Sequence, residues 1–346
     1  MLDERKREIL RAIIEDYISD AEPIGSRSVA KKHDLKISPA TIRNEMADLE
    51  VLGYLEQPHT SAGRVPSAKG YRFYVDYLMA PKQMSKKDIL DISNWYQSKA
   101  KRVEEVFQET AKILSTTTNN ISMVLAPQLS KCFFKYLQFL PLDEKRSIVV
   151  IVTNEGLVEN KVVEIPEGLM YDDLHRIANC INTKLSGISI DRIKSSLLTE
   201  IQQDILRDPI LFETALQVLQ QVLATDDKKR RLYLGGAKEA LNQPEFRDVE
   251  KIKKLLTLLE EETLLRDILY MDKTDKVSVT IGQESHFTGV NNCSVVKATY
   301  RLDGQIVGSI AVLGPTRMEY GKVMTTLDFM CCHLSEILSK YKLGKL

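Results

Sequence analysis

Residues 38–51 read SPATIRNEMADLEV and contain one of the clearest helix starts in the chain. Ser38 suits the N-cap position and Pro39 suits the first helical position. Gly53 follows as a helix stop. Apolar side chains recur at helical spacing along one face, namely Ile42, Met46, Leu49 and Leu52. The sequence therefore predicts a helix with one buried face and one face free to meet a partner.

Two further helices are predicted before this one. Apolar residues recur at helical spacing over residues 3–20, and Asp3 suits the N-cap position. A break at residues 21–25 contains Pro23 and a glycine. Ser26 then caps a short helix that runs to about His33.

A strand-turn-strand unit follows the third helix. The predicted strands are residues 54–57 and 64–66, the turn is 58–63, and another helix begins near Ser67. Three helices followed by two strands is the order of a winged helix-turn-helix, whose third helix lies in the DNA major groove. We therefore predict a winged-helix DNA-binding domain over residues 1–80.

The third helix carries the groups that such a domain needs. Arginine can meet guanine O6 and N7, asparagine can meet adenine N6 and N7, and small residues allow close approach. Backbone N–H groups at the start of a helix can hold a phosphate. The residues expected to contact DNA are Arg27, Ser38, Ala40, Thr41, Arg43, Asn44, His59, Ser61, Arg64, Lys69 and Arg72.

Local charge agrees with this prediction, although the whole chain of 346 residues has a formal net charge of zero. Between Ile24 and Asn44 the basic residues are Arg27, Lys31, Lys32, Lys36 and Arg43, and the acidic residue is Asp34. Residues 57–75 contain three basic residues and no acidic one. A DNA-binding prediction must therefore rest on local charge and motif.

The remaining chain is long enough for further domains. A linker helix region is expected over residues 81–120. Strand patterns over 121–165 and again from 277 enclose a helix-rich block, which indicates an α/β domain in two halves, 121–190 and 277–346, with an insertion at 191–276. The Leu-rich stretch over 251–269 is either core of that insertion or a dimer interface.

Several other functions find little support in the sequence. The five histidines and five cysteines show no metal-ligand spacing and no Cys-x-x-Cys, and no local motif suggests catalysis, so we expect no metal, no cofactor and no enzyme. The cysteines suit a reducing compartment as buried apolar residues, with a redox sensor at Cys331 and Cys332 as the alternative. The charged start and an apolar run no longer than 148–152 predict a cytoplasmic protein without a membrane span.

The run Gly314-Pro315-Thr316-Arg317-Met318 allows two interpretations. It could hold an anion at the start of the last helix. It could instead be a turn whose proline sets the helix start and whose Arg317 pairs internally, which is the interpretation we favour.

The same segments resemble the heat-inducible transcription repressor HrcA family. The resemblance is carried by residues 38–50 and 52–55, by the wing at 58–66 with residues 69–72 and 74–76 after it, and by 308–320 near the end. The wing and the run Gly314–Met318 are specific signals, because generic winged helices lack both. The resemblance covers both ends of the chain, in order.

Membership of this family implies an α+β multidomain protein: an N-terminal winged helix-turn-helix and a GAF-like domain that carries an inserted dimerisation domain. It also implies a homodimer that represses chaperone operons by binding double-stranded DNA at an inverted repeat, the CIRCE element, until heat stress releases it. The chaperonin GroEL is implied as a modulator. The alternative is a ligand- or redox-sensing regulator with the same DNA-binding head.

Overall fold

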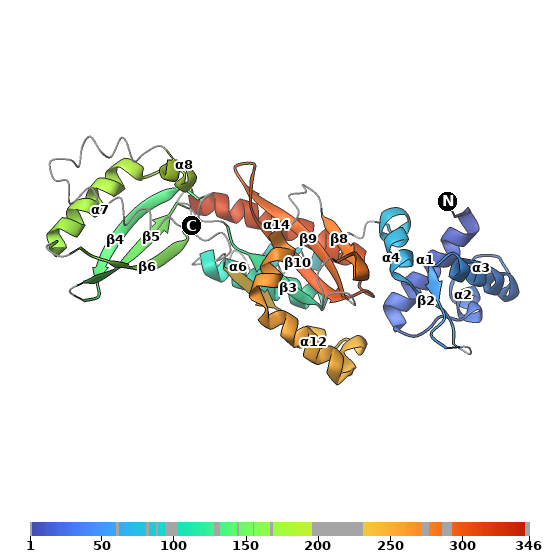
Figure 1. Cartoon of the computed structure of the whole chain (residues 1–346). Helices are drawn as coiled ribbons and strands as arrows, with labels where there is room; N and C mark the ends of the chain where they lie inside the picture. Colours follow the sequence, from blue (N-terminus) through green and yellow to red (C-terminus); the bar gives the residue numbers. More distant parts are fainter. Residues whose placement is uncertain are drawn as a thin grey trace.

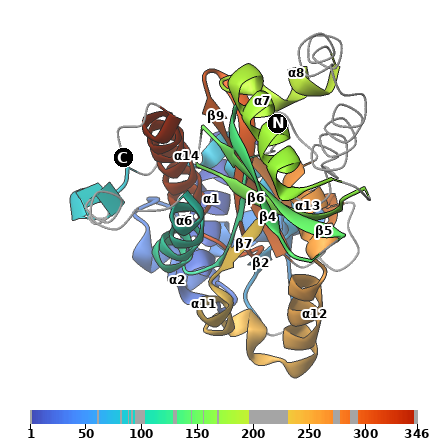
Figure 2. The same ribbon diagram turned by 90° about the vertical axis from the view of Figure 1, so that its left-hand side faces the viewer.

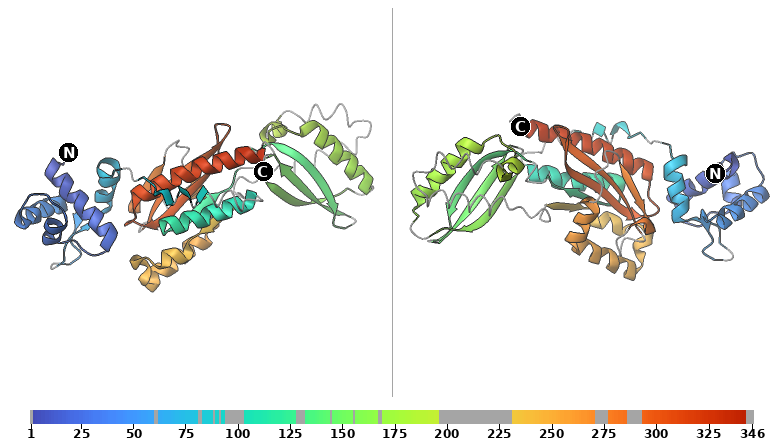
Figure 3. Two further views of the ribbon diagram at one scale, coloured as in Figure 1. Left: turned by 180° about the vertical axis from the view of Figure 1, so that it is seen from behind. Right: turned by 45° about the horizontal axis from the view of Figure 1, so that its top comes forward.

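The molecule is elongated, with three structural units in a row (Figure 1). The computed structural model describes residues 2–59, 62–80, 83–87, 89–90, 92–93, 103–127, 132–143, 145–154, 156–166, 169–195, 231–270, 277–285 and 293–342. The N-terminal unit lies at one end and a three-stranded sheet lies at the other. A five-stranded sheet with helices on both faces lies between them (Figure 3).

The N-terminal unit, called the head below, has the predicted winged-helix order. Its elements are α1 (Glu4–Asp20), α2 (Ser26–Lys32), α3 (Pro39–Val51), β1 (Leu55–Glu56), β2 (Val65–Pro66) and α4 (Ala68–Phe73), which continues as the π-helical turn η1 (Tyr74–Leu78). Strands β1 and β2 pair antiparallel. The predicted helices, wing and fourth helix are thereby confirmed.

Local capping explains where these helices begin. The Asp3 carboxylate accepts a hydrogen bond from the Lys6 N–H at 2.8 Å, and the Ser38 hydroxyl accepts one from the Thr41 N–H at 3.1 Å. The predicted cap at Ser26 is wrong. Gly25 is the N-cap of α2 and no side chain caps that helix, so the short α2 depends on packing for its stability.

Apolar residues of the head pack together in a cluster that continues into the core of the central unit. Apolar faces of α1 and α3 meet there, and Val29 of α2 and Leu55 of β1 complete it. The large buried apolar residues of α1 and α3 are Ile9, Leu10, Ile13, Ile14, Ile42, Met46 and Leu49. Helical spacing placed these residues on one face of each helix, and burial of those faces fixes the position of α3.

The central unit is a five-stranded antiparallel sheet with the strand order β7-β3-β10-β9-β8. The strands are β3 (Ile121–Leu125), β7 (Leu232–Gly235), β8 (Ser278–Ile281), β9 (Cys293–Leu302) and β10 (Gln305–Pro315). Strand β10 pairs along its length with β9, and its residues Ser309–Leu313 also pair with β3. The sheet therefore joins chain segments that are far apart in sequence.

Helices cover both faces of this sheet (Figure 2). One face packs against α6 (Val103–Thr118) and α14 (Tyr320–Lys342), and the other against α11 (Ala237–Leu241), α12 (Val249–Glu260) and α13 (Glu262–Tyr270). Alternate residues of β3 serve the two cores: Val124 faces the first and Met123 the second. Leu255, Leu258 and Leu265 are buried in the second core, so the Leu-rich stretch packs as core.

The third unit consists of β4 (Phe134–Pro141), β5 (Arg146–Thr153), β6 (Val158–Glu164), α7 (Tyr171–Leu185) and α8 (Ile190–Ser195). The strands form an antiparallel meander in the order β4-β5-β6. Helix α7 covers one face through Leu174, Ile177 and Ile181, which are buried.

Strand pairing differs from the division expected from the sequence. Strands at 134–164 were expected in the same domain as 121–125 and 277–346, yet they form a separate sheet. Conversely, β7 and α11–α13 were expected in the insertion, yet they join the central sheet and its core. The physical reason is that periodicity identifies strands and helices but says nothing of their distant partners. Residues 196–230, most of the remaining expected insertion, lie outside the described part of the chain.

Candidate nucleic-acid interface

The first turn of α3 is capped by a side chain and is largely exposed. The Ser38 hydroxyl caps the helix and lies 2.9 Å from the Thr41 hydroxyl. Ser38, Pro39 and Ala40 are exposed, and Thr41 is half-buried. Because the first N–H groups of a helix lack partners within it, this exposed first turn can donate hydrogen bonds to a phosphate.

The exposed face of α3 carries two side chains suited to base recognition. Arg43 and Asn44 are exposed, and neither has a hydrogen-bond or ion-pair partner among the described residues. Ile42, on the apolar face of α3, is fully buried in the core. Packing of the apolar face therefore turns the guanidinium and the amide outward, which confirms the expected orientation of both side chains.

Acidic groups on the later part of α3 are held away from this face by α1. Lys6 lies 2.7 Å from the Glu45 carboxylate and 3.1 Å from that of Asp48. Hydrogen bonds to these two carboxylates raise the pKa of Lys6, so it stays protonated. These ion pairs join α1 to α3 and neutralise charges that would otherwise repel DNA.

A third short strand segment supports the wing. Ile24 and Arg64 exchange two backbone hydrogen bonds of 2.9 Å, which adds residue 24 to the β1–β2 ribbon. Gly63 lies so close to this segment that a Cβ would come within 2.4 Å of the Ile24 carbonyl oxygen. His59 is exposed near the turn, and the predicted contact residue Ser61 lies outside the described residues.

Three of the predicted contact residues are engaged within the protein. The Arg64 Nε donates to the Glu50 carboxylate at 2.7 Å, which ties the wing to α3. The Lys69 Nζ donates to the Leu52 carbonyl at 2.8 Å, although this side chain remains exposed. Arg72 points to the central unit rather than to solvent, as described below.

Four other basic or polar side chains remain available near α3. Arg27 and His59, both predicted, are exposed and have no partner among the described residues. Lys31 and Lys36 are likewise exposed and unpaired within the described chain. In the sequence these lysines contribute only local charge, because no spacing rule separates them from Lys32, which pairs with Asp20 at 2.6 Å.

The cysteines offer little support for a redox site. Cys132, Cys293 and Cys331 are buried, as predicted, whereas Cys180 is half-buried and Cys332 is exposed. Burial raises the pKa of Cys293 to about 11 and raises that of Cys331 further. Because the thiolate is the reactive form, these buried thiols are poorly suited to sensing oxidants.

Within the described ranges, no cluster of histidine, cysteine and acidic residues could hold a metal ion. Nor does any helix in the described part of the chain have the length and apolar character needed to cross a bilayer.

Comparison with known proteins gives consistent matches over nearly the whole chain. A family model described as "Winged helix-turn-helix transcription repressor, HrcA DNA-binding" matches residues 1–75, and one described as "HrcA protein C terminal domain" matches residues 104–324. A solved structure described as a hypothetical protein has a similar fold, with a TM-score of 0.67 and 24% identity over 99% of this chain and 100% of that chain.

Curated relatives named "Heat-inducible transcription repressor HrcA" are similar from end to end. The relative from Pelotomaculum thermopropionicum is 44% identical, and the match covers 99% of each chain. The relatives from Desulfitobacterium hafniense and Brevibacillus brevis are 44% and 43% identical, and each match covers 98% of both chains.

Proposed function

Because this chain belongs to the HrcA family of heat-inducible transcription repressors, we propose that it represses class I heat-shock operons, which encode chaperones. Its operator is the inverted repeat called the CIRCE element, and heat stress releases the protein from it. The protein is a DNA-binding regulator and not an enzyme. We base this proposal on the two faces of α3: Ile42 is buried, and Arg43 and Asn44 are exposed.

In this proposal α3 enters the major groove with its first turn foremost. Arg43 and Asn44 meet base edges, and Ala40 and Thr41 allow close approach. The Ser38 end of the helix binds a phosphate, and Arg27, Lys31 and Lys36 add phosphate contacts. His59, near the wing turn, contacts the DNA backbone beside the groove, and Ser61 is proposed as a further DNA contact.

An inverted repeat calls for a partner with two-fold symmetry, so we propose that the protein acts as a homodimer. The described surface that best suits a second copy is the open face of the β4–β5–β6 sheet, opposite α7. Three cross-strand rows form this face: Leu140, Ile148 and Val162; Gln138, Val150 and Asn160; Tyr136, Val152 and Val158.

Apolar side chains dominate these rows, and several are well exposed. Val162 is 57% exposed, Tyr136 41% and Leu140 40%. A contiguous apolar patch of this kind marks an interaction surface more often than scattered apolar residues do. We expect Val162→Lys to convert the dimer to a monomer in sedimentation equilibrium. Asn179→Lys adds the same charge on exposed α7 and should leave the dimer intact.

The protein acts on DNA in the cytoplasm, and the chaperonin GroEL modulates its activity. The central five-stranded unit is the GAF-like domain that the family resemblance implies.

Titration of operator DNA at fixed salt tests the recognition surface. Arg43→Ala and Asn44→Ala should each weaken binding by about 1–3 kcal/mol per half-site and relax preference at one base pair, because each removes a bidentate base contact. Arg176→Ala is the matched control, since Arg176 is exposed on α7 in the third unit. Unchanged operator affinity in both α3 variants would contradict the proposed recognition helix.

A further inference from the structure

Arg72 of α4 links the head to the central unit. Its Nη2 donates to the Val279 carbonyl at 2.6 Å, and its Nε donates to the Glu284 carboxylate at 2.8 Å. Glu284 lies in the short 3-10 turn η5 (Gly282–Glu284), where it also accepts a hydrogen bond from the Ile281 N–H at 2.8 Å. Both acceptors are thus fixed to β8 and its end.

Arg317 of the central unit makes a second link, to the head. It lies between β10 and α14, and its Nη1 donates to the carbonyl of Ile18 in α1 at 2.5 Å. Its Nε donates to the Glu245 carboxylate at 2.6 Å, and Nη2 donates to the Gln243 side chain at 3.1 Å. The Arg317 side chain is only 10% exposed, so its charge is neutralised inside the contact. This confirms the predicted internal pairing of Arg317.

A pair of aromatic rings joins the same two units. The rings of Tyr71 and Tyr320 lie 5.9 Å apart, and both side chains are about 1% exposed. Tyr71 precedes Arg72 in the chain, and Tyr320 lies three residues after Arg317. The two arginine links and the ring pair therefore form one contact region, which we call the head clamp (Arg72, Glu284, Arg317, Tyr71 and Tyr320).

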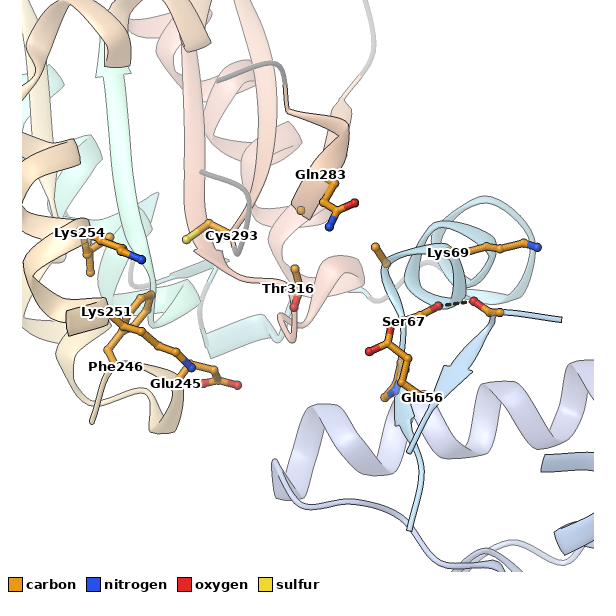
Figure 4. Close-up of a pocket in the computed structure, with 15 residues that line it drawn as sticks. Glu56, Ser67, Lys69, Glu245, Phe246, Lys251, Lys254, Gln283, Cys293 and Thr316 are labelled. Atoms are coloured by element: carbon orange, nitrogen blue, oxygen red, sulfur yellow. Dashed lines mark hydrogen bonds between the residues drawn. The ribbon is translucent and has the colours of Figure 1, made fainter. Parts of the chain in front are cut away.

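Beside the head clamp the two units separate. A cleft of about 570 Å³ lies between them, with Glu56 and Ser67 on the head and Lys251 and Lys254 on the central unit (Figure 4). Among the described residues that line this cleft, no ion pair crosses from the head to the central unit. The head clamp thus holds the head at one side of this cleft, where Tyr71 and Tyr320 are buried.

The head clamp lies away from the proposed DNA surface. Arg72 and Tyr71 belong to α4, whereas Arg43 and Asn44 belong to α3, at the outer end of the molecule (Figure 1). The head clamp therefore leaves the recognition face free and restricts rotation of the head relative to the central unit.

We propose that Arg72 and Glu284 are positioning residues, which hold each head at a fixed angle and thereby set the distance between the two heads of a dimer. This inference rests on the proposed homodimeric binding to an inverted repeat. When the two heads are already held at the operator spacing, binding of the second half-site costs no further conformational freedom. The affinity for the inverted repeat is therefore higher, and it depends on the distance between the half-sites. Arg72 accordingly acts through the head and does not contact DNA.

The test compares the full chain with Arg72→Ala, Glu284→Ala and the double variant. Arg176→Ala serves as the control, and thermal melts check that each variant folds. Three duplexes are titrated: the CIRCE inverted repeat, a single half-site, and the inverted repeat with its half-sites moved apart by about five base pairs, half a helical turn. Salt dependence is measured for each.

We expect both single variants to lose affinity for the inverted repeat, on the order of tenfold, while half-site affinity and the salt slope stay unchanged. The double variant should lose no more than either single one, because the two residues form one link. In all three variants, the loss of affinity caused by moving the half-sites apart should be smaller than in the wild type.

If Arg72 instead bound a phosphate, Arg72→Ala would weaken half-site binding and lower the salt slope, and Glu284→Ala would not weaken binding. That pattern overturns the inference, as does an unchanged spacing penalty in the variants. A wild-type chain that bound the inverted repeat no better than a half-site would overturn the proposed homodimeric binding and the head clamp's role together.

Discussion

Arg64→Ala should destabilise the head without removing a DNA contact, although the sequence placed this residue on the DNA surface. In the structure its Nε and Nη2 both lie 2.7 Å from one oxygen of Glu50. The Arg64 side chain is 19% exposed and that of Glu50 is 33% exposed. A phosphate could take the Nε and Nη2 donors of Arg64 only by breaking this pair, which joins the wing to α3.

The magnitude follows from that intermediate exposure. Exposed ion pairs contribute about 0.2–1 kcal/mol, whereas loss of one partner of a buried pair costs about 3–5 kcal/mol. A pair in which both side chains are partly exposed lies between these limits, so we expect Arg64→Ala to lower the free energy of unfolding by roughly 1–3 kcal/mol. Glu50→Ala should cost a similar amount, and the double variant should cost less than the sum.

Two measurements decide the question. Urea unfolding of the wild type, both single variants and the double variant gives the coupling energy. The salt dependence of operator binding counts phosphate contacts, because each contact contributes about 0.9 to the slope of log K against log salt. We expect that slope to stay at its wild-type value in Arg64→Ala. Unchanged unfolding together with a reduced slope would refute the internal role of Arg64.

Further substitutions probe the helix, the wing and the thiols. Ile42→Ala should lower the free energy of unfolding by about 2–5 kcal/mol in urea titration, because this fully buried side chain leaves a cavity. Ser38→Ala should cost about 1 kcal/mol through loss of the α3 cap, and a stability equal to wild type would count against the cap. Gly63→Ala should weaken operator binding while the central unit melts normally, because the added Cβ displaces the wing from Ile24. In alkylation followed by mass spectrometry, the buried Cys331, whose pKa burial raises, should stay unmodified in the native protein; rapid labelling would restore the redox alternative.

The head could be predicted from sequence because its signals are local. The Ser38 hydroxyl caps an N–H three residues away, and the buried face of α3 repeats every three or four residues. Such signals act within one or two helical turns, so they persist whatever the rest of the chain does. The outward direction of Arg43 and Asn44 followed from the burial of the opposite face.

Partners that lie far apart along the chain were decided by the tertiary structure. Strand β3 pairs with β10 and β7, and no local pattern distinguished these partners from β4. Arg72 was expected at DNA, yet its carboxylate partner, Glu284, is 212 residues away. An arginine looks the same in sequence whether it meets a phosphate or a distant carboxylate, because only the folded chain brings the acceptor within hydrogen-bond distance. Local hydrogen bonds and periodicity thus determined the elements, and long-range packing determined which charges remain free to bind DNA.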